Sequence, residues 1–356
     1  MDIDNRKVME FQSIRPNKLV VYNRDINRIK SAATSNKSLK NWTDEERAVF
    51  GLPAKKERNI NKHNFELSKS AQKTLQEKIT WLYYYAKKRT ITTHNNKVLA
   101  DFKMNFVTLK LPSEQKHSSD FITKNCLNQL LVELSKKISL KNYVWRLEYQ
   151  KNGNLHYHIA MDKYIDYRLL RNIWNRILSK YGYVQAYTEK FSKMQIHEYI
   201  KLYFDKDKND FATLEKRFAE GCRTKWKTPN TVDVKMCTNS KAVAFYISKY
   251  FGKNSSTGSE KKLQVNEENS GNSRLWFCSR SLSKLKAISD MTEALGGSYA
   301  VFLEGMNNVK KLICDYCIVY YFNIKDLCNN GKRAFYDLFK NYGIETGYLD
   351  APPAKG

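Results

Sequence analysis

The sequence predicts an α+β protein with a central antiparallel sheet flanked by helices and with an extension at each end. Two observations predict this class. Between residues 101 and 285 the patterns follow the order strand, helix, hairpin, helix, strand, helix, and a hairpin joins antiparallel neighbours. A chain of 356 residues is also long enough for one large domain or two modest ones, each with a buried core.

Three parts are expected along the chain. Residues 1–100 are predicted to be a mostly helical N-terminal region, because Ser68 or Ser70 precedes apolar residues at near-helical spacing up to Ala86. Residues 101–285 form the predicted main domain, in which 252–273 contain almost nothing to bury and are expected to be a surface loop. Residues 286–356 are the predicted C-terminal extension.

The elements of the main domain follow from periodicity and turn signals. Polar and apolar residues alternate over 104–111 until Pro112, which predicts a strand. Two further strands flank Lys151-Asn152-Gly153, which is a turn sequence typical of a β-hairpin. These two strands span 142–149 and 155–161, and the remaining predicted elements are helices over 121–134, 168–178 and 240–251 and a strand over 231–237.

The charge of the chain indicates a polyanionic partner. It carries 62 Lys and Arg against 36 Asp and Glu, a formal net charge of +26, which argues against an ordinary metabolic enzyme. Hydrophobic residues make up 42% and aromatic residues 13%, too much for a disordered basic tail. The sequence therefore predicts a folded protein that binds nucleic acid.

Membrane and export signals are not expected. No apolar run approaches the ~18 residues of a membrane span, and the N-terminus lacks the pattern of a signal peptide. Seven cysteines, an odd number, indicate reduced thiols. A zinc site at Cys314 and Cys317 with Cys328 is the alternative for three of them, although such sites usually need two CxxC pairs. A cytoplasmic location without a membrane partner follows.

The first chemical motif is His156-Tyr157-His158 on the second hairpin strand. Residues two apart on a strand point to one face, so the two imidazoles are a ready pair of metal ligands. Glu148 is the expected third ligand. A two-residue loop at Asn152-Gly153 would turn it away, whereas a three-residue loop with a left-handed Gly153 would set it opposite His156. The alternative is two histidines on a half-exposed strand without a metal.

The second motif places two tyrosines and two lysines on one helical stripe. These residues are Tyr246, Lys249, Tyr250 and Lys253, spaced three and four apart. Because a phenol ionises near pH ~10 in water, a tyrosine nucleophile needs a metal-polarised target or a nearby cation. The alternative is a solvated basic helix whose tyrosines pack against the sheet edge.

Taken together, the two motifs resemble HUH-superfamily replication initiators, the Rep endonucleases of single-stranded DNA phages and related plasmids. The stretch from Trp145 to His158 is similar to the metal motif of that group and the strand before it, and YxxKYxxK follows on a later helix. Phe106-Val107-Thr108-Leu109 lies where the first family strand is expected. The resemblance spans roughly residues 101–285 and implies a ferredoxin- or RRM-like sheet.

The resemblance also implies a mechanism. His156, His158 and Glu148 would hold Mg²⁺ or Mn²⁺, and two imidazoles favour Mn²⁺ over Mg²⁺ in affinity. Tyr246 or Tyr250 would attack the scissile phosphate, leaving a 5′-phosphotyrosyl link and a free 3′-hydroxyl; the sequence leaves their order open. The enzyme would thus nick and rejoin single-stranded DNA at an origin and start rolling-circle replication.

The expected partners follow from this activity. Arg146, Lys151 and Trp145 would contact single-stranded or hairpin origin DNA, with core packing as the alternative for Trp145. The chain lacks a GxxxxGK[ST] loop, so a host helicase would unwind the DNA and a host polymerase extend it, in the bacterial cytoplasm if the gene is phage- or plasmid-encoded. The other functions considered are a non-enzymatic basic DNA-binding or packaging protein and an HUH transposase or relaxase.

Overall fold

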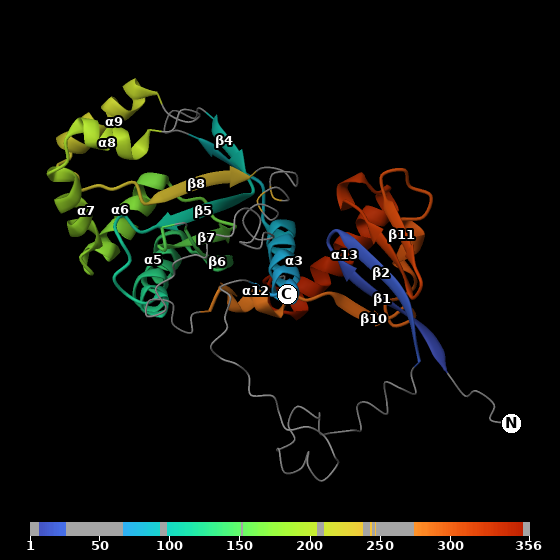
Figure 1. Ribbon diagram of the computed structural model, residues 1–356. Coiled ribbons are helices and arrows are strands. Elements are labelled where there is room, and N and C mark those ends of the chain that lie inside the picture. The colour runs from blue at the N-terminus through green and yellow to red at the C-terminus, as the bar shows by residue number, and fades with distance from the viewer. Residues whose placement is uncertain are drawn as a thin grey trace, which may run out of the picture. The chain divides into compact units, whose positions relative to one another are not determined.

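The computed structural model describes residues 7–25, 67–92, 98–150, 152–204, 210–237, 243, 246 and 274–351 (Figure 1). The chain forms two compact units. The central unit covers residues 65–283, and the terminal unit combines residues 1–64 with 284–356. Both units contain antiparallel sheets and helices, so the predicted α+β class is confirmed.

The central unit is built on a five-stranded antiparallel sheet. The strand order is β8 (Val232–Cys237), β5 (Met104–Lys110), β7 (Leu155–Met161), β6 (Tyr143–Tyr149) and β9 (Trp276–Cys278). Four of these strands coincide with the strands that the sequence predicted. The fifth, β9, is a three-residue edge strand that was not predicted.

The β6–β7 hairpin has the three-residue loop. The backbone N–H of Gln150 donates to the carbonyl of Asn154 at 2.7 Å, which leaves three residues between them. Gly153 has a φ of 82°, a left-handed conformation that glycine adopts without a side-chain clash. In this register Glu148 pairs directly with His156. Of the two loops considered from the sequence, the one that supports the metal hypothesis is confirmed.

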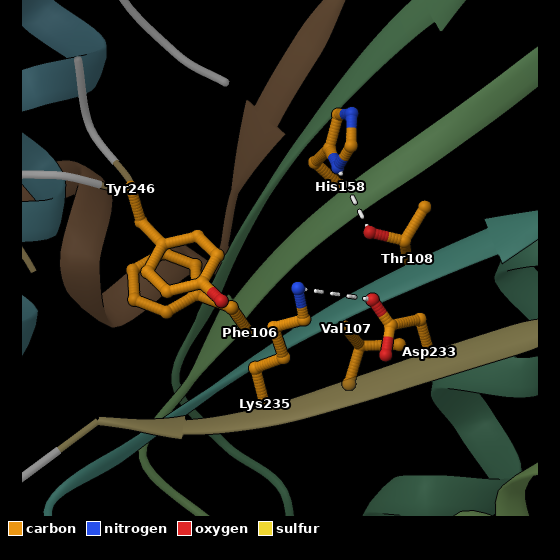
Figure 2. A pocket seen from close by; sticks show the side chains of 7 residues that line it. All are labelled: Phe106, Val107, Thr108, His158, Asp233, Lys235 and Tyr246. Atoms are coloured by element: carbon orange, nitrogen blue, oxygen red, sulfur yellow. Dashed lines mark hydrogen bonds and ion pairs between the residues drawn. The ribbon is translucent and has the colours of Figure 1, made fainter. Parts of the chain in front are cut away.

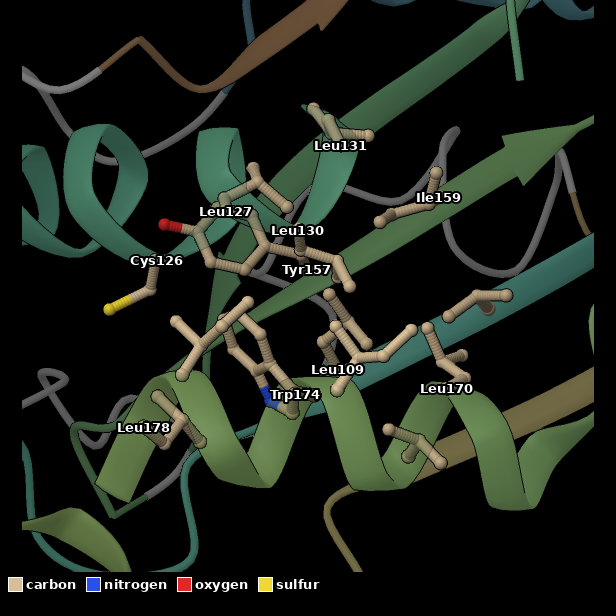
Figure 3. Close-up of a cluster of buried hydrophobic side chains, with 14 of the residues drawn as sticks. Leu109, Cys126, Leu127, Leu130, Leu131, Tyr157, Ile159, Leu170, Trp174 and Leu178 are labelled. Atoms are coloured by element: carbon tan, nitrogen blue, oxygen red, sulfur yellow. The ribbon is translucent and has the colours of Figure 1, made fainter. Parts of the chain in front are cut away.

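Helices cover one face of this sheet with a hydrophobic core (Figure 3). The core includes Leu109 from β5, Tyr157 from β7, and Leu130 and Trp174 from the helices, and each side chain is fully buried. The helices are α4 (Ser119–Ile122), η1 (Thr123–Leu127), α5 (Asn128–Ile138) and α6 (Tyr167–Ser179). The helix predicted over 121–134 is therefore present, but a π-helical turn at η1 interrupts it.

Two other parts of the central unit differ in how well the sequence predicts them. Helix α3 (Lys69–Tyr85) begins where expected, because the Ser68 hydroxyl accepts a hydrogen bond from the Ala71 N–H at 3.1 Å. Helices α7 (Tyr183–Ser192), α8 (Ile196–Tyr203) and α9 (Phe211–Arg223) were not predicted. They enclose a small aromatic core of their own around Trp226. A two-stranded sheet is formed by β3 (Arg89–Thr92) and β4 (Val98–Phe102).

The terminal unit contains a second five-stranded antiparallel sheet. Its strand order is β10 (Ile288–Met291), β1 (Val8–Arg15), β2 (Lys18–Asp25), β12 (Cys317–Tyr321) and β11 (Lys310–Cys314). The helical elements after β10 are η3 (Tyr299–Phe302), η4 (Ile324–Asp326) and α13 (Asn329–Glu345). Helix α12 (Arg280–Lys284) lies at the sequence boundary between the two units.

The predicted helical character of residues 1–100 is wrong for the described N-terminal part. Residues 8–25 form a β-hairpin, and this hairpin pairs with β10 and β12 from the C-terminal segment. The apolar side chains of Ile14 and Leu19 are fully buried in that sheet, which the hairpin alone would leave exposed. The two predicted extensions are thus one unit.

Two other expectations from the sequence have different outcomes. The surface loop predicted over 252–273 lies outside the described residues, and so does all of the helix predicted over 240–251 except Val243 and Tyr246, which are both helical. Among the described residues, no helix combines the length and the apolar character that a membrane crossing requires.

The buried core on one face of the central sheet generates a stability prediction. Leu109→Ala leaves a cavity between β5 and the helices, and we expect it to lower the free energy of unfolding by about 2–5 kcal/mol. Val132→Ala on α5, where the side chain is 55% exposed, should change it by no more than about 0.5 kcal/mol.

Urea unfolding followed by tryptophan fluorescence measures both variants, since five of the six tryptophans belong to the central unit. Equal midpoints for the two variants would contradict this account of the core.

Candidate metal centre and catalytic pocket

The second face of the central sheet, opposite the hydrophobic core, carries the histidine pair. His156 and His158 alternate on β7 with Tyr157, whose side chain is fully buried in the core. On β6, Glu148 pairs with His156 and Arg146 pairs with His158, so all four polar side chains belong to one face. The strand period and the hairpin register together bring them into one cluster.

The three predicted ligands meet at nearly equal distances. The Nε2 atoms of His156 and His158 each lie 3.1 Å from Oε2 of Glu148, and they lie 3.1 Å from each other. Among the described residues, this is the one group of three His, Cys, Asp or Glu side chains arranged to hold a metal ion. His158 is buried, and the other two are half-buried.

Neighbouring side chains orient all three groups. A guanidinium nitrogen of Arg146 lies 3.1 Å from Oε1 of Glu148, which leaves Oε2 directed at the histidines. The Nδ1 atom of His158 lies 3.1 Å from the hydroxyl of Thr108 on β5, and Nδ1 of His156 lies 3.1 Å from the side-chain amide of Gln150. Each imidazole is therefore held at its far nitrogen, a common arrangement for metal-binding histidines.

The environment keeps the ligands in their metal-binding protonation states. Burial alone would raise the pKa of Glu148, but its contacts with His156 and His158 and the charge of Arg146 outweigh burial and lower this pKa to about 2. Burial lowers the pKa of His158, and the contact with Glu148 only partly opposes that effect. At neutral pH the site thus offers a carboxylate and a neutral His158.

The donor set fits a small divalent cation. If each imidazole keeps its proton on Nδ1, three lone pairs converge at 3.1 Å without a proton between them, an arrangement that a cation stabilises. Adjacent ligands of an octahedral ion with bonds of about 2.0–2.1 Å lie about 2.9 Å apart, close to the separations seen here. One carboxylate oxygen with two imidazoles favours Mn²⁺ over Mg²⁺.

Tyr246 lies in a small pocket beside the cluster (Figure 2). Its ring stacks on Phe106 of β5, with centroids 4.5 Å apart and an angle of 11° between the planes. His158 lines the same pocket, so the structure brings the first predicted tyrosine and a predicted metal ligand to one place. Lys235 on β8 pairs with Phe106 in the sheet and also lines the pocket, 3.7 Å from the carboxylate of Asp233.

Two predicted DNA contacts are wrong. Trp145 is 3% exposed and lies on the core face, where its ring packs edge-on against Tyr157 at 5.8 Å, so the core-packing alternative describes it. Arg146 is also buried, and its guanidinium pairs with Glu148 because the strand alternation puts both side chains on the site face. It positions a ligand and does not reach a DNA backbone.

The remaining predicted site residues are Tyr250, Lys249, Lys253 and Lys151, and they lie outside the described residues. The zinc alternative receives no support from the described cysteines. Cys314 and Cys317 face each other across the β11–β12 hairpin, but no third ligand, including Cys328, joins them within the described part of the chain.

Three site residues were missed by the sequence reasoning. Thr108 and Lys235 come from strands whose place beside β7 is decided by the sheet order, which no local pattern reveals. Gln150 could have been found, because it ends the hairpin strand two residues after Glu148 and therefore shares its face.

Comparison with known proteins gives one match. Residues 104–255 match a family of replication-associated proteins of the ORF2 type, a family consistent with rolling-circle replication initiators. The matched segment runs from the first residue of β5 past Tyr246 and includes all three clustered ligands. The resemblance to replication initiators that the sequence predicted is thereby confirmed for this segment. No curated protein and no solved structure matches the chain.

The contact between Thr108 and His158 generates a prediction for metal binding. Thr108→Val removes the hydroxyl that holds Nδ1, and we expect the affinity of metal-stripped protein for Mn²⁺ to fall by about 10- to 100-fold. Thr108→Ser keeps the hydroxyl and should retain the affinity. Isothermal titration calorimetry measures both, with thermal melting to confirm folding, and equal binding by the valine variant would refute the orienting role.

Proposed function

We propose that this chain is a metal-dependent HUH-type endonuclease and ligase that nicks single-stranded DNA at a replication origin and initiates rolling-circle replication. One observation carries the proposal. The Glu148, His156 and His158 cluster and Tyr246 meet around one pocket, which His158 lines. The match to a replication-associated family supports the biological role, and the net charge of +26 supports a DNA substrate.

Each residue has a defined task in this reaction. A divalent ion bound by the three ligands would polarise the scissile phosphate as a Lewis acid. The phenol oxygen of Tyr246, held by stacking on Phe106, attacks phosphorus and gives up its proton, while the bond from phosphorus to the 3′ oxygen breaks and that oxygen takes up a proton. The ammonium group of Lys235 stabilises the phosphate charge in the pocket.

The products account for both nicking and joining. The 5′-phosphotyrosyl link retains the energy of the phosphodiester, so a 3′-hydroxyl can reverse the attack and seal the strand without ATP. Tyr250 is proposed as the second nucleophile, which cleaves the regenerated origin, and Lys249 and Lys253 as further cations on the same helical stripe. A separate host helicase and polymerase in the bacterial cytoplasm would supply unwinding and synthesis.

A covalent adduct assay tests the nickase directly. Purified protein is incubated with a library of end-labelled single-stranded hairpin oligonucleotides, with Mn²⁺ or with EDTA, and resolved on a denaturing gel. We expect label to migrate with the protein only in Mn²⁺, because cleavage needs both the metal and a tyrosine. The Tyr246→Phe/Tyr250→Phe variant should lose the adduct completely.

Tyr167→Phe is the matched control for that assay, since Tyr167 is 47% exposed on α6 and should keep full activity. Salt-sensitive DNA binding without an adduct on any substrate would instead identify a non-enzymatic basic DNA-binding protein.

A second prediction concerns the lysine in the pocket. Lys235→Met removes the cation beside Tyr246 while keeping an aliphatic chain, and we expect adduct formation to slow by about 100-fold or more. Lys235→Arg keeps the charge and should recover part of the rate. Single-turnover time courses at saturating DNA measure both variants, and an unchanged rate for the methionine variant would exclude Lys235 from the reaction.

A further inference from the structure

The sheet of the terminal unit has two faces of opposite chemical character. Because paired residues share a face, the strand registers assign every side chain of the five strands. Four of the five basic residues in these strands fall on one face, namely Arg15, Lys18, Arg24 and Lys310. All three acidic residues of the strands, Glu10, Asp25 and Asp290, fall on the other.

The acid-bearing face is the one that packs against the rest of the unit. Gln12 on this face is fully buried and accepts a hydrogen bond from the Tyr299 N–H of η3 at 2.9 Å. Tyr320, also on this face, is buried and hydrogen-bonds to Glu304. The core of the terminal unit therefore lies on this side.

The basic face carries aromatic rings between its cations. The rings of Phe11 and Tyr22 stack across β1 and β2, with centroids 6.0 Å apart and 20° between the planes. The guanidinium of Arg24 lies 5.4 Å from the Tyr22 ring, and the ammonium of Lys18 lies 5.3 Å from the ring of Tyr321. Tyr321 is 40% exposed, and Phe11 and Tyr22 are half-buried. We call this surface the aromatic face.

We propose that the aromatic face binds single-stranded DNA, with bases stacked on Phe11, Tyr22 and Tyr321 and phosphates paired with the surrounding cations. Rings and cations without a carboxylate on one sheet face suit a strand whose bases are free to stack, whereas paired bases in a duplex present no ring faces. The inference rests on the proposed function in that its ligand is DNA. It adds a contact in a different unit from the one that contains the metal centre.

Photocrosslinking tests the face without any substitution. The full chain is mixed in EDTA with a single-stranded oligonucleotide in which thymines are replaced by 5-iodouracil, which forms adducts with stacked aromatic residues. After irradiation and proteolysis, mass spectrometry should find DNA adducts on peptides that contain Phe11, Tyr22 or Tyr321. Adducts confined to peptides from residues 65–283 would overturn the proposal.

Matched variants measure the contribution of stacking. Phe11→Leu/Tyr22→Leu keeps apolar side chains in the sheet but removes two rings, and the Kd for a single-stranded oligonucleotide should rise by about 5- to 150-fold for each base that loses a stacking partner. Tyr336→Leu on α13, where the tyrosine is 43% exposed, is the control and should not change the Kd. Fluorescence anisotropy in EDTA gives both values, and an unchanged Kd for the folded double variant would overturn the proposal.

The salt dependence of binding tests the cations separately. Arg24→Gln should reduce the slope of log K against log salt by about 0.7, the value for one phosphate contact on a single strand. Arg333→Gln on α13, whose side chain is 87% exposed, should leave the slope unchanged. A slope for Arg24→Gln equal to that of the unaltered protein would remove this residue from the DNA path.

Failure here can be distinguished from failure of the proposed nickase. All binding is measured in EDTA, where cleavage is not expected, and the adduct assay reports on the central unit. A covalent adduct together with unchanged binding by the face variants refutes the aromatic face alone. Ring-dependent binding without an adduct refutes the nickase and leaves the aromatic face supported.

Discussion

The candidate site depends on the register of the β6–β7 hairpin. Three residues separate Gln150 from Asn154, and Gly153 closes the loop in a left-handed conformation. Because side chains alternate along a strand, a slip of one residue would move Glu148 to the core face and leave His156 and His158 without a carboxylate. A loop of three residues, with one glycine, thus decides whether the ligand cluster exists at all.

The central sheet assigns stability and chemistry to its two faces. The core face is sealed by apolar helices, and it also explains why a tyrosine stands between the histidines, since the Tyr157 hydroxyl bonds to the Thr123 hydroxyl at 2.7 Å within the core. On the other face the same rigid strands hold Thr108 and the metal ligands. Side chains fixed by neighbouring strands lose little freedom when a metal or a phosphate binds, which favours a preorganised site.

Burial and charge act together around the ligand cluster. Arg146 is buried next to Glu148, so one carboxylate oxygen is neutralised by a fixed cation and the other is directed at the histidines. This arrangement keeps Glu148 ionised in a largely buried environment, where an unpaired carboxylate would otherwise take up a proton. The aromatic face of the terminal unit uses the opposite device, with cations and rings on one side and every strand carboxylate on the other.

The sequence by itself determined the local elements of the central unit, because hairpin turns, helix caps and alternation act over a few residues. It predicted α3 with its Ser68 cap, the hairpin, and a shared face for the two histidines, and its motifs predicted the family match. Only the tertiary structure decided which strands neighbour β7, and so which residues, Thr108 and Lys235 among them, complete the site. It also paired residues 8–25 with strands almost 300 residues away and buried Trp145, because strand pairing and burial depend on contacts between segments that no local pattern encodes.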